Sequence, residues 1–176
     1  LARLLAALLA GVFASSGARA ESAPPAPADG WVAFEATWSA FGERLVLRAG
    51  DREAVTTHLS GALTILRGEG LRKGYRGEAL FYSDGRGAGV GTLVLTDDHG
   101  DQVFCDLAGE AAAGGAQVRG TIRGGTGAYS RLSGDLSFRW RHLVKTPDGE
   151  VQGVAEDFEG RYRRTPGGTP EAEGPR

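Results

Sequence analysis

The amino-acid sequence predicts an all-β protein, a closed antiparallel barrel of about eight strands. Apolar and polar residues alternate with a period of two through most of residues 31–164, as in strands with one buried face. The 29 glycines are scattered singly, and each would cost a helix interior about 1 kcal/mol. Many short strands at close spacing, with no helix between them, favour a meander-type barrel, although the same strand count also permits an open sandwich.

The N-terminal segment has the features of a secretory signal peptide. Arg3 stands for its charged end, the run from Leu4 to Phe13 for its apolar core, and Ala18-Arg19-Ala20 for its cleavage site. The apolar run is shorter than the roughly 20 residues that a membrane-spanning helix needs. We therefore expect an exported protein, periplasmic or secreted, with no membrane span. Its expected parts are the signal peptide (1–20), a Pro/Ala-rich leader (21–30), the barrel domain (31–164) and a disordered tail (165–176).

Charge and cysteine content narrow the class of protein further. The net charge is −2, and it falls to −4 with the signal peptide removed, because that segment holds two arginines and no acidic residue. A negative domain does not favour a nucleic-acid partner. Cys105 is the only cysteine and can form no internal disulfide, so stability has to come from packing and from the hydrogen-bonded sheet.

Nine segments have the pattern of strands, and Phe41-Gly42 is read as the break between the first two. In the third segment, Gly61 suggests a bend or a bulge. The fourth segment, between Tyr75 and Tyr82, leaves its inward face ambiguous. The expected strands are 31–40, 43–49, 53–66, 75–82, 90–96, 102–110, 117–123, 135–145 and 151–163.

A glycine-rich stretch, Gly120 to Trp140, contains the sharpest motif of the chain. A chain that bends sharply between paired strands needs positive φ angles, which are inexpensive only for glycine. A phosphate-binding reading lacks the P-loop lysine and the Rossmann spacing. The stretch therefore predicts a structural corner over which Tyr129 folds back. The residues assigned to this corner are Gly124, Gly125, Gly127, Tyr129 and Gly134.

This corner resembles the G-G-T-G-x-Y/F signature of the allene oxide cyclase and dirigent barrel superfamily. The residues that carry the resemblance are Gly124-Gly-Thr-Gly-Ala-Tyr and the following Leu132-Ser-Gly134, whereas Arg131 stands where the family often has a small residue. The resemblance implies an eight-stranded, calycin-type antiparallel barrel and possible assembly into homo-oligomers. The chain is nearest to small exported bacterial members with no assigned activity. The family's catalytic residues are not carried over, because only the corner aligns residue by residue.

Glu156 is the first candidate for catalytic chemistry. It shares a predicted strand face with Val154 and Phe158, and a carboxyl group on a buried strand face would have a raised pKa and could act as a general acid or base. The alternative is that this face points outward, or that Glu156 pairs with an arginine of a neighbouring strand. Further catalytic candidates are Glu78, His58 and Tyr82.

Neither a metal nor a cofactor is expected, because the three histidines lack metal-ligand spacing and no cofactor motif is present. Candidates for lining the lumen are Phe138, Trp140, Glu156, Phe158 and Cys105, the last read as a buried, inert thiol. Two functions follow. The first is the binding of a small apolar or amphipathic molecule, or a structural or interaction role. The second is a cofactor-free cyclase or isomerase that acts in an apolar lumen.

Overall fold

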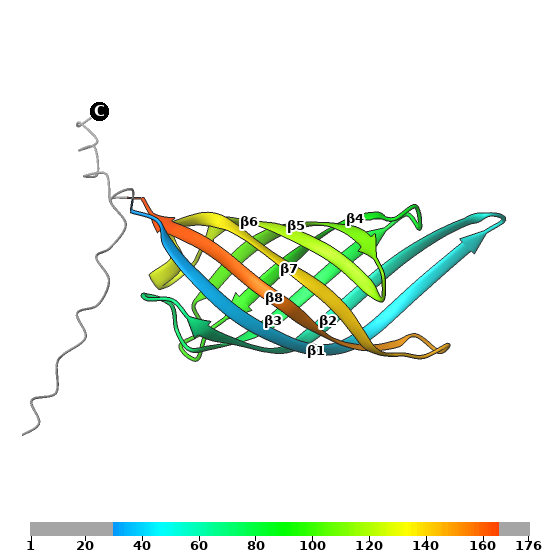
Figure 1. Ribbon diagram of the computed structural model, residues 1–176, viewed down its shortest axis with the longest axis horizontal. Helices are drawn as coiled ribbons and strands as arrows, with labels where there is room; N and C mark the ends of the chain where they lie inside the picture. The colour runs from blue at the N-terminus through cyan, green and yellow to red at the C-terminus, as the bar shows by residue number, and fades with distance from the viewer. Residues whose placement is uncertain (1–29, 166–176) are drawn as a thin grey trace, which may run out of the picture.

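The computed structural model describes residues 30–165, which form a closed barrel of eight antiparallel strands in sequence order. Each strand pairs with the next, and β8 pairs with β1 to complete the ring (Figure 1). A single 3-10 turn, Gly127–Tyr129, interrupts the strands between β6 and β7. The strands are β1 (Val32–Ala49), β2 (Arg52–Arg67), β3 (Gly74–Ser83), β4 (Ala88–Thr96), β5 (Gln102–Ala112), β6 (Gly115–Gly125), β7 (Leu132–Lys145) and β8 (Glu150–Arg164).

The expectation of nine segments was wrong at one position, because the first two are a single strand. β1 pairs with β2 without interruption through Phe41 and Gly42. A Cβ atom at position 42 would lie 3.1 Å from the Cα of Leu59 and closer still to the His58 carbonyl. Gly42 therefore lets two strand backbones approach each other and does not end a strand.

Gly61 has the same role on the facing strand. The ladders of β2 with β1 and with β3 both run through Gly61 without a register shift, so the bulge considered there is absent. A Cβ atom at this position would lie 2.6 Å from the Cα of Ala40. Gly42 and Gly61 thus allow a close approach of the β1 and β2 backbones in the middle of this strand pair.

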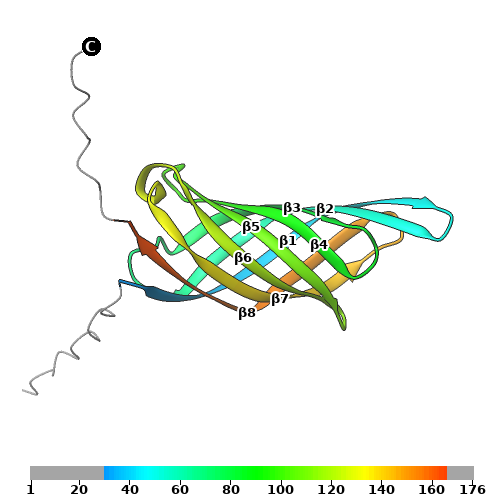
Figure 2. The same ribbon diagram turned by 90° about the horizontal axis from the view of Figure 1, so that it is seen from above.

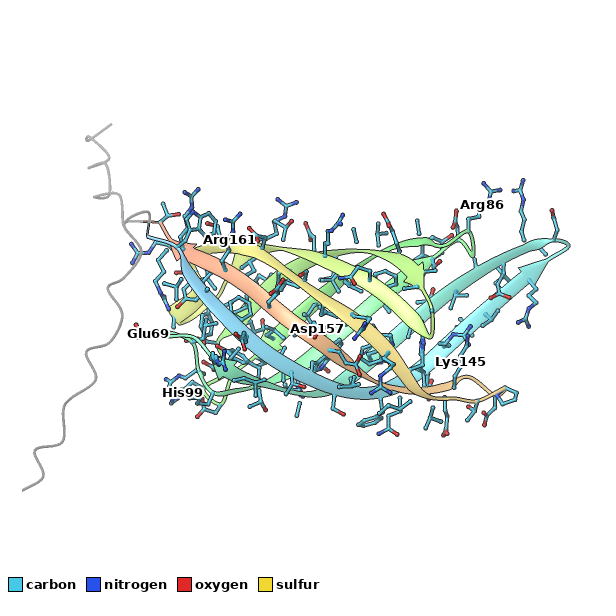
Figure 3. All side chains as sticks on the ribbon, in the orientation of Figure 1. Glu69, Arg86, His99, Lys145, Asp157 and Arg161 are labelled. Carbon is cyan, nitrogen blue, oxygen red and sulfur yellow. The ribbon has the colours of Figure 1, made fainter. Side chains whose placement is uncertain are left out.

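The two ends of the barrel hold different connections between strands. One end holds the chain termini, the β2–β3 and β4–β5 connections and the β6–β7 corner; the other holds the remaining four turns (Figures 1 and 2). In Figure 3, Glu69 and His99 mark the first end, and Arg86 and Lys145 mark the second. We call them the closed end and the open end, for the reasons given below.

A polar cluster seals the closed end, and we call it the Asp97 cluster (Arg72, Tyr75, Asp97 and Tyr129). Tyr75, Asp97 and Tyr129 are buried, whereas Arg72 lies at the exposed edge, with its Nε 3.7 Å from Asp97 Oδ2. The hydroxyl group of Tyr129 donates a hydrogen bond to Asp97 Oδ2 over 2.9 Å and lies 3.0 Å from the hydroxyl group of Tyr75. The backbone N–H groups of His99 and Asp101 also donate to Asp97. Burial alone would raise the pKa of Asp97, but these hydrogen bonds and the nearby Arg72 hold it below its usual value.

The glycine corner delivers Tyr129 into this cluster. Gly124 and Gly127 have φ angles of +121° and +47°, a region that favours glycine. Gly125 faces a tight space, where a Cβ atom would lie 2.8 Å from the Cβ of Tyr129. At Gly134 an added Cβ atom would lie 2.9 Å from the Cα of Tyr162. Tyr129 itself is buried, so it fills the barrel end and does not lie on the outer surface.

An irregularity in β8 overturns the predicted face of Glu156. Asp157 is the only described non-glycine residue with a positive φ, +51°, and the ladders on both sides of β8 shift register at this point. The extra residue reverses the alternation. Phe158 and Tyr162 therefore face the lumen, as expected, whereas Val154 and Glu156 face outward.

Candidate functional site

The lumen contains a cavity of about 410 Å³ that opens at the end opposite the Asp97 cluster. Its wall is mainly apolar, and small residues on the inward faces of β3 to β6 leave the space that larger side chains would fill. The main side chains in this wall are Trp38, Leu59, Ala79, Phe81, Leu107, Ala116, Val118, Phe138 and Trp140. A site with one mouth and an apolar wall is the usual form of a small-molecule pocket in a β-barrel.

Packed aromatic rings form the floor of this cavity. The Trp38 ring lies 5.5 Å from the Trp140 ring and meets the Phe138 ring edge-on at 6.3 Å. Below them, Phe138 stacks on Phe158 at 4.9 Å. Trp38 is only 1% exposed, and its indole nitrogen has no hydrogen-bond partner among the described residues. These packed rings close the lumen below the cavity.

Gly77 makes room for the Trp38 ring. A Cβ atom at position 77 would lie 2.8 Å from the indole nitrogen of Trp38. β3 therefore presents its Tyr75, Gly77, Ala79 and Phe81 face to the lumen, which settles the face that the sequence left ambiguous. The consequence is that Phe81 stands in the cavity wall.

Charged groups surround the mouth of the cavity. Arg44 of β1, Glu53 of β2, Glu110 of β5 and Lys145 of β7 all border it, above the apolar wall. Glu53 is paired with Arg48 at 3.0 Å, and its side chain is 38% exposed. The site thus combines an apolar interior with a polar rim, an arrangement that suits an apolar molecule with one polar end.

His142 is the titratable group of the cavity wall. Its Nδ1 lies 3.3 Å from the carbonyl oxygen of Gly114, and its ring meets the Trp140 ring edge-on. Burial lowers the pKa of His142, and the positive charges of Lys145 and Arg44 lower it further, while the contact with Gly114 opposes them. The imidazole is therefore neutral at pH 7 and offers the cavity a hydrogen-bonding group without a charge.

Glu156 does not belong to this cavity. Its carboxylate accepts hydrogen bonds on the outer wall from Arg139 at 3.0 Å and from Arg141 at 2.5 Å. These bonds and charges lower its pKa, so the predicted raised pKa was wrong as well. The alternative reading, an ion pair with arginines of the neighbouring strand, is the one found.

The other catalytic candidates also lie on the outer wall. His58 is exposed on β2 opposite Leu80, and Tyr82 is 48% exposed on β3. Glu78 faces outward on β3 and pairs with Arg76 at 3.0 Å. The structure does not bring these residues together with Glu156, and none of them borders the cavity.

The lumen candidates divide between the cavity and the filled half of the barrel. Phe138 and Trp140 line the cavity, as expected. Cys105 and Phe158 face the lumen but lie in its filled half, buried and away from the cavity wall. Burial raises the pKa of the Cys105 thiol to about 12, with a smaller effect from Asp106, and its unreactive character stays a prediction.

Most of the cavity residues were not among the predicted site residues, and His142 and Phe81 show why. His142 continues the alternation of Phe138 and Trp140 along β7, and this period of two was the signal that could have identified it. Phe81 follows Gly77 and Ala79 on one face, and a face with such small residues is easily mistaken for an outer one. Phe81 lines the cavity because of the strands that face it across the barrel, and the sequence does not show which strands these are.

Comparisons with known proteins add no family to this description. No family model matches the chain, and neither a curated protein nor a solved structure matches it. Among residues 30–165, no group of three or more His, Cys, Asp or Glu side chains is placed to hold a metal ion. The same residues contain no helix long and apolar enough to cross a membrane. The predicted signal peptide, the leader up to residue 29 and the tail after residue 165 lie outside the described residues.

Proposed function

We propose that this protein is an exported β-barrel that binds a small apolar or amphipathic molecule in its open-end cavity. The observation that carries the proposal is the cavity itself, about 410 Å³ with an aromatic floor and a charged rim. This volume falls within the range of about 300 to 1,000 Å³ that is typical of ligand pockets. The apolar part of the ligand would lie against Trp140 and Phe81, and its polar end at the mouth near Arg44 and Lys145.

Binding is favoured over catalysis by the position of the carboxyl groups. The isomerase hypothesis rested on a buried Glu156, and that side chain faces solvent between two arginines. His142 borders the cavity, but proton transfer within the barrel would need a second group matched to it. Export rests on the signal-peptide pattern of residues 1–20.

Kinship with the allene oxide cyclase and dirigent barrels is part of the proposal. Two features support it: a ring of eight antiparallel strands in sequence order, and a glycine corner at Gly124–Gly127 between the sixth and seventh strands. The kinship would place the ligand inside the barrel. It assigns no reaction to this chain.

The experiment fills the cavity and measures ligand affinity. N-Phenyl-1-naphthylamine, a neutral apolar fluorophore, is titrated into the wild-type protein and into the Ala116→Phe variant. Ala116 is partly buried on the inward face of β6 and lines the cavity, so a benzyl group there occupies ligand space. We expect saturable binding by the wild type and an affinity loss of about tenfold or more in the variant, equivalent to about 1.4 kcal/mol.

Thr121→Phe is the matched control, because Thr121 is exposed on the outward face of the same strand. It adds a similar ring without entering the lumen, and its affinity should equal that of the wild type. Circular dichroism melts of both variants establish that they are folded. The proposal fails if the wild type shows no saturable binding, or if folded Ala116→Phe binds the fluorophore as well as Thr121→Phe does.

A further inference from the structure

Two cations at the mouth of the cavity lack an acidic partner. Arg44 of β1 and Lys145 of β7 both border the cavity. Among residues 30–165, no carboxylate forms an ion pair with either side chain. Two positive charges held at one site repel each other, so an anion placed between them would be bound favourably.

An irregularity in β7 turns Lys145 toward the lumen. His142 lines the cavity, and simple alternation from it would direct the side chain of residue 145 outward. The ladder of β7 with β8 shifts register between His142 and Val144, so that Lys145 lies opposite Val151, which is buried on the inner face of β8. Bulges of this kind commonly re-aim a side chain beside a site. Here the shift places a cation at the mouth of the cavity.

The turn between β7 and β8 holds the second cation beside the first. The N–H group of Arg44 donates to the carbonyl oxygen of Gly149 in this turn over 2.7 Å. Burial lowers the pKa of His142 most, and the charges of Lys145 and Arg44 lower it further, so all three groups lie close together. We call them the basic cluster (Arg44, His142 and Lys145). With His142 neutral at pH 7, its charge comes from Arg44 and Lys145.

The acidic residues at the mouth do not offset these charges. Glu53 faces the lumen but pairs at 3.0 Å with Arg48, the residue directly opposite it on β1. Glu110 is exposed on the face of β5 opposite to that of the buried Leu107, so its carboxylate lies on the outer wall. The cavity mouth is therefore positive, although the net charge of the chain is −2.

We propose that the ligand of this cavity is an amphiphile with one apolar tail and an anionic head group, a carboxylate or a phosphate. The head group would lie between Arg44 and Lys145, and the tail would extend along the apolar wall to the floor at Trp38. This inference rests on the proposed function and adds the sign of the charge that the mouth selects. The Arg44 guanidinium group offers paired N–H donors, which both carboxylates and phosphates accept.

Other head groups fit the mouth less well. A cationic head group would meet two like charges and find no lumen-facing carboxylate that is unpaired among residues 30–165. A neutral head group would leave the repulsion between Arg44 and Lys145 in place. The apolar wall beneath the cations also reduces the screening of their charge, which favours an anion further.

Four ligands that share a ten-carbon tail test the charge of the head group: decanoate, decyl phosphate, decan-1-ol and decyltrimethylammonium. Each displaces N-phenyl-1-naphthylamine from the wild-type protein at pH 7, and the displacement gives its affinity. We expect at least one anion to bind about tenfold more tightly than the alcohol, and the ammonium ligand to bind more weakly than the alcohol. Added salt should reduce this preference, because it screens charges at a solvent-exposed mouth. The tighter of the two anions identifies the head group as a carboxylate or a phosphate.

Substitutions in the basic cluster test where the preference arises. Lys145 is exposed, so Lys145→Gln should fold normally and should lower the ratio of anion affinity to alcohol affinity by about threefold to fivefold. Adding Arg44→Gln should bring this ratio close to one. Lys145→Glu should shift the preference toward the ammonium ligand.

Arg86→Gln is the matched control. It removes one positive charge at the same end of the barrel, but Arg86 is exposed in the β3–β4 turn and does not border the cavity (Figure 3). Its ratio of anion affinity to alcohol affinity should equal that of the wild type. Circular dichroism melts establish that each variant is folded.

Equal wild-type affinities for the anions and the alcohol overturn this inference and leave the proposed function intact, because the tail still displaces the fluorophore. A preference that Arg86→Gln reduces as much as Lys145→Gln does also overturns it, since the selectivity would then come from the overall charge of the open end. A wild-type protein that binds no fluorophore overturns the proposed function, and this inference with it.

Discussion

Tyr129→Phe tests whether the Asp97 cluster holds the closed end together. The substitution keeps the buried ring, which is 1% exposed, and removes only the hydroxyl group. That hydroxyl group donates to the carboxylate of Asp97 at 2.9 Å and lies 3.0 Å from the hydroxyl group of Tyr75. The cluster joins β3, the β4–β5 turn and the β6–β7 corner, three segments far apart in sequence.

The expected loss follows from the chemistry of this hydrogen bond. A hydrogen bond to a charged group contributes about 1.5 to 3 kcal/mol, and removing the donor leaves the Asp97 carboxylate buried with one partner fewer. We expect the free energy of unfolding to fall by about 2 kcal/mol. For a domain of this size, the melting temperature should fall by about 6 to 10 °C.

The pH dependence provides a second readout. The pKa of Asp97 is lowered in the folded protein, so its contribution to stability is complete above the usual carboxyl pKa and is lost as the pH falls through the lowered value. Tyr129→Phe removes one cause of the lowering. The difference in stability between variant and wild type should therefore be largest near pH 7 and shrink in acid.

Urea unfolding followed by circular dichroism, at pH 7 and at steps down to about pH 3, measures both effects. Tyr82→Phe is the control, because the Tyr82 side chain is 48% exposed on the outer wall and the loss of its hydroxyl group should change little. Equal stability of Tyr129→Phe and Tyr82→Phe at pH 7 would refute the reasoning. A difference that does not shrink in acid would refute the role assigned to the charge of Asp97.

Two further predictions concern the lumen and the wall. Cys105 has a pKa of about 12 and is buried, so a thiol reagent at pH 8 should label the unfolded protein readily and the native protein hardly at all; rapid native labelling would place this thiol elsewhere. Gly61→Val should lower the free energy of unfolding by more than about 3 kcal/mol, because even a Cβ atom there would lie 2.6 Å from the Cα of Ala40. Gly74→Val is the control, since no atom lies within 4 Å of a Cβ atom added at that site. In a thermal melt its loss of stability should be far smaller.

Local patterns were enough to predict the architecture. Alternation along β2, with Leu59, Leu63 and Ile65 inward, holds in the structure, and so does the inward face of β5 around Cys105. The glycine corner was also identified from its residues alone. These features depend on neighbours in the chain, and the side-chain period of two turns them into faces of a sheet.

The candidate site was predicted only in part, and β8 shows the reason. A single extra residue at Asp157 reverses the alternation, so Glu156 faces solvent although Phe158, two positions later, faces the lumen. The alternation of residues along β8 did not predict this bulge, because a register shift is defined by pairing with the neighbouring strands. The prediction that the Glu156 carboxyl group lies in the lumen with a raised pKa was therefore wrong.

The sequence by itself determined the class of fold and the inward faces of the regular strands, the face of Cys105 included, because these follow from hydrophobic period and turn chemistry. Only the tertiary structure decided where the lumen is filled and where it is hollow. Whether Gly77 accommodates Trp38, and whether Tyr129 reaches Asp97, depends on segments that meet only when the barrel closes. Among residues 30–165, closure also leaves the edge of β1 beyond Arg44 without a paired strand, a consequence of unequal strand lengths.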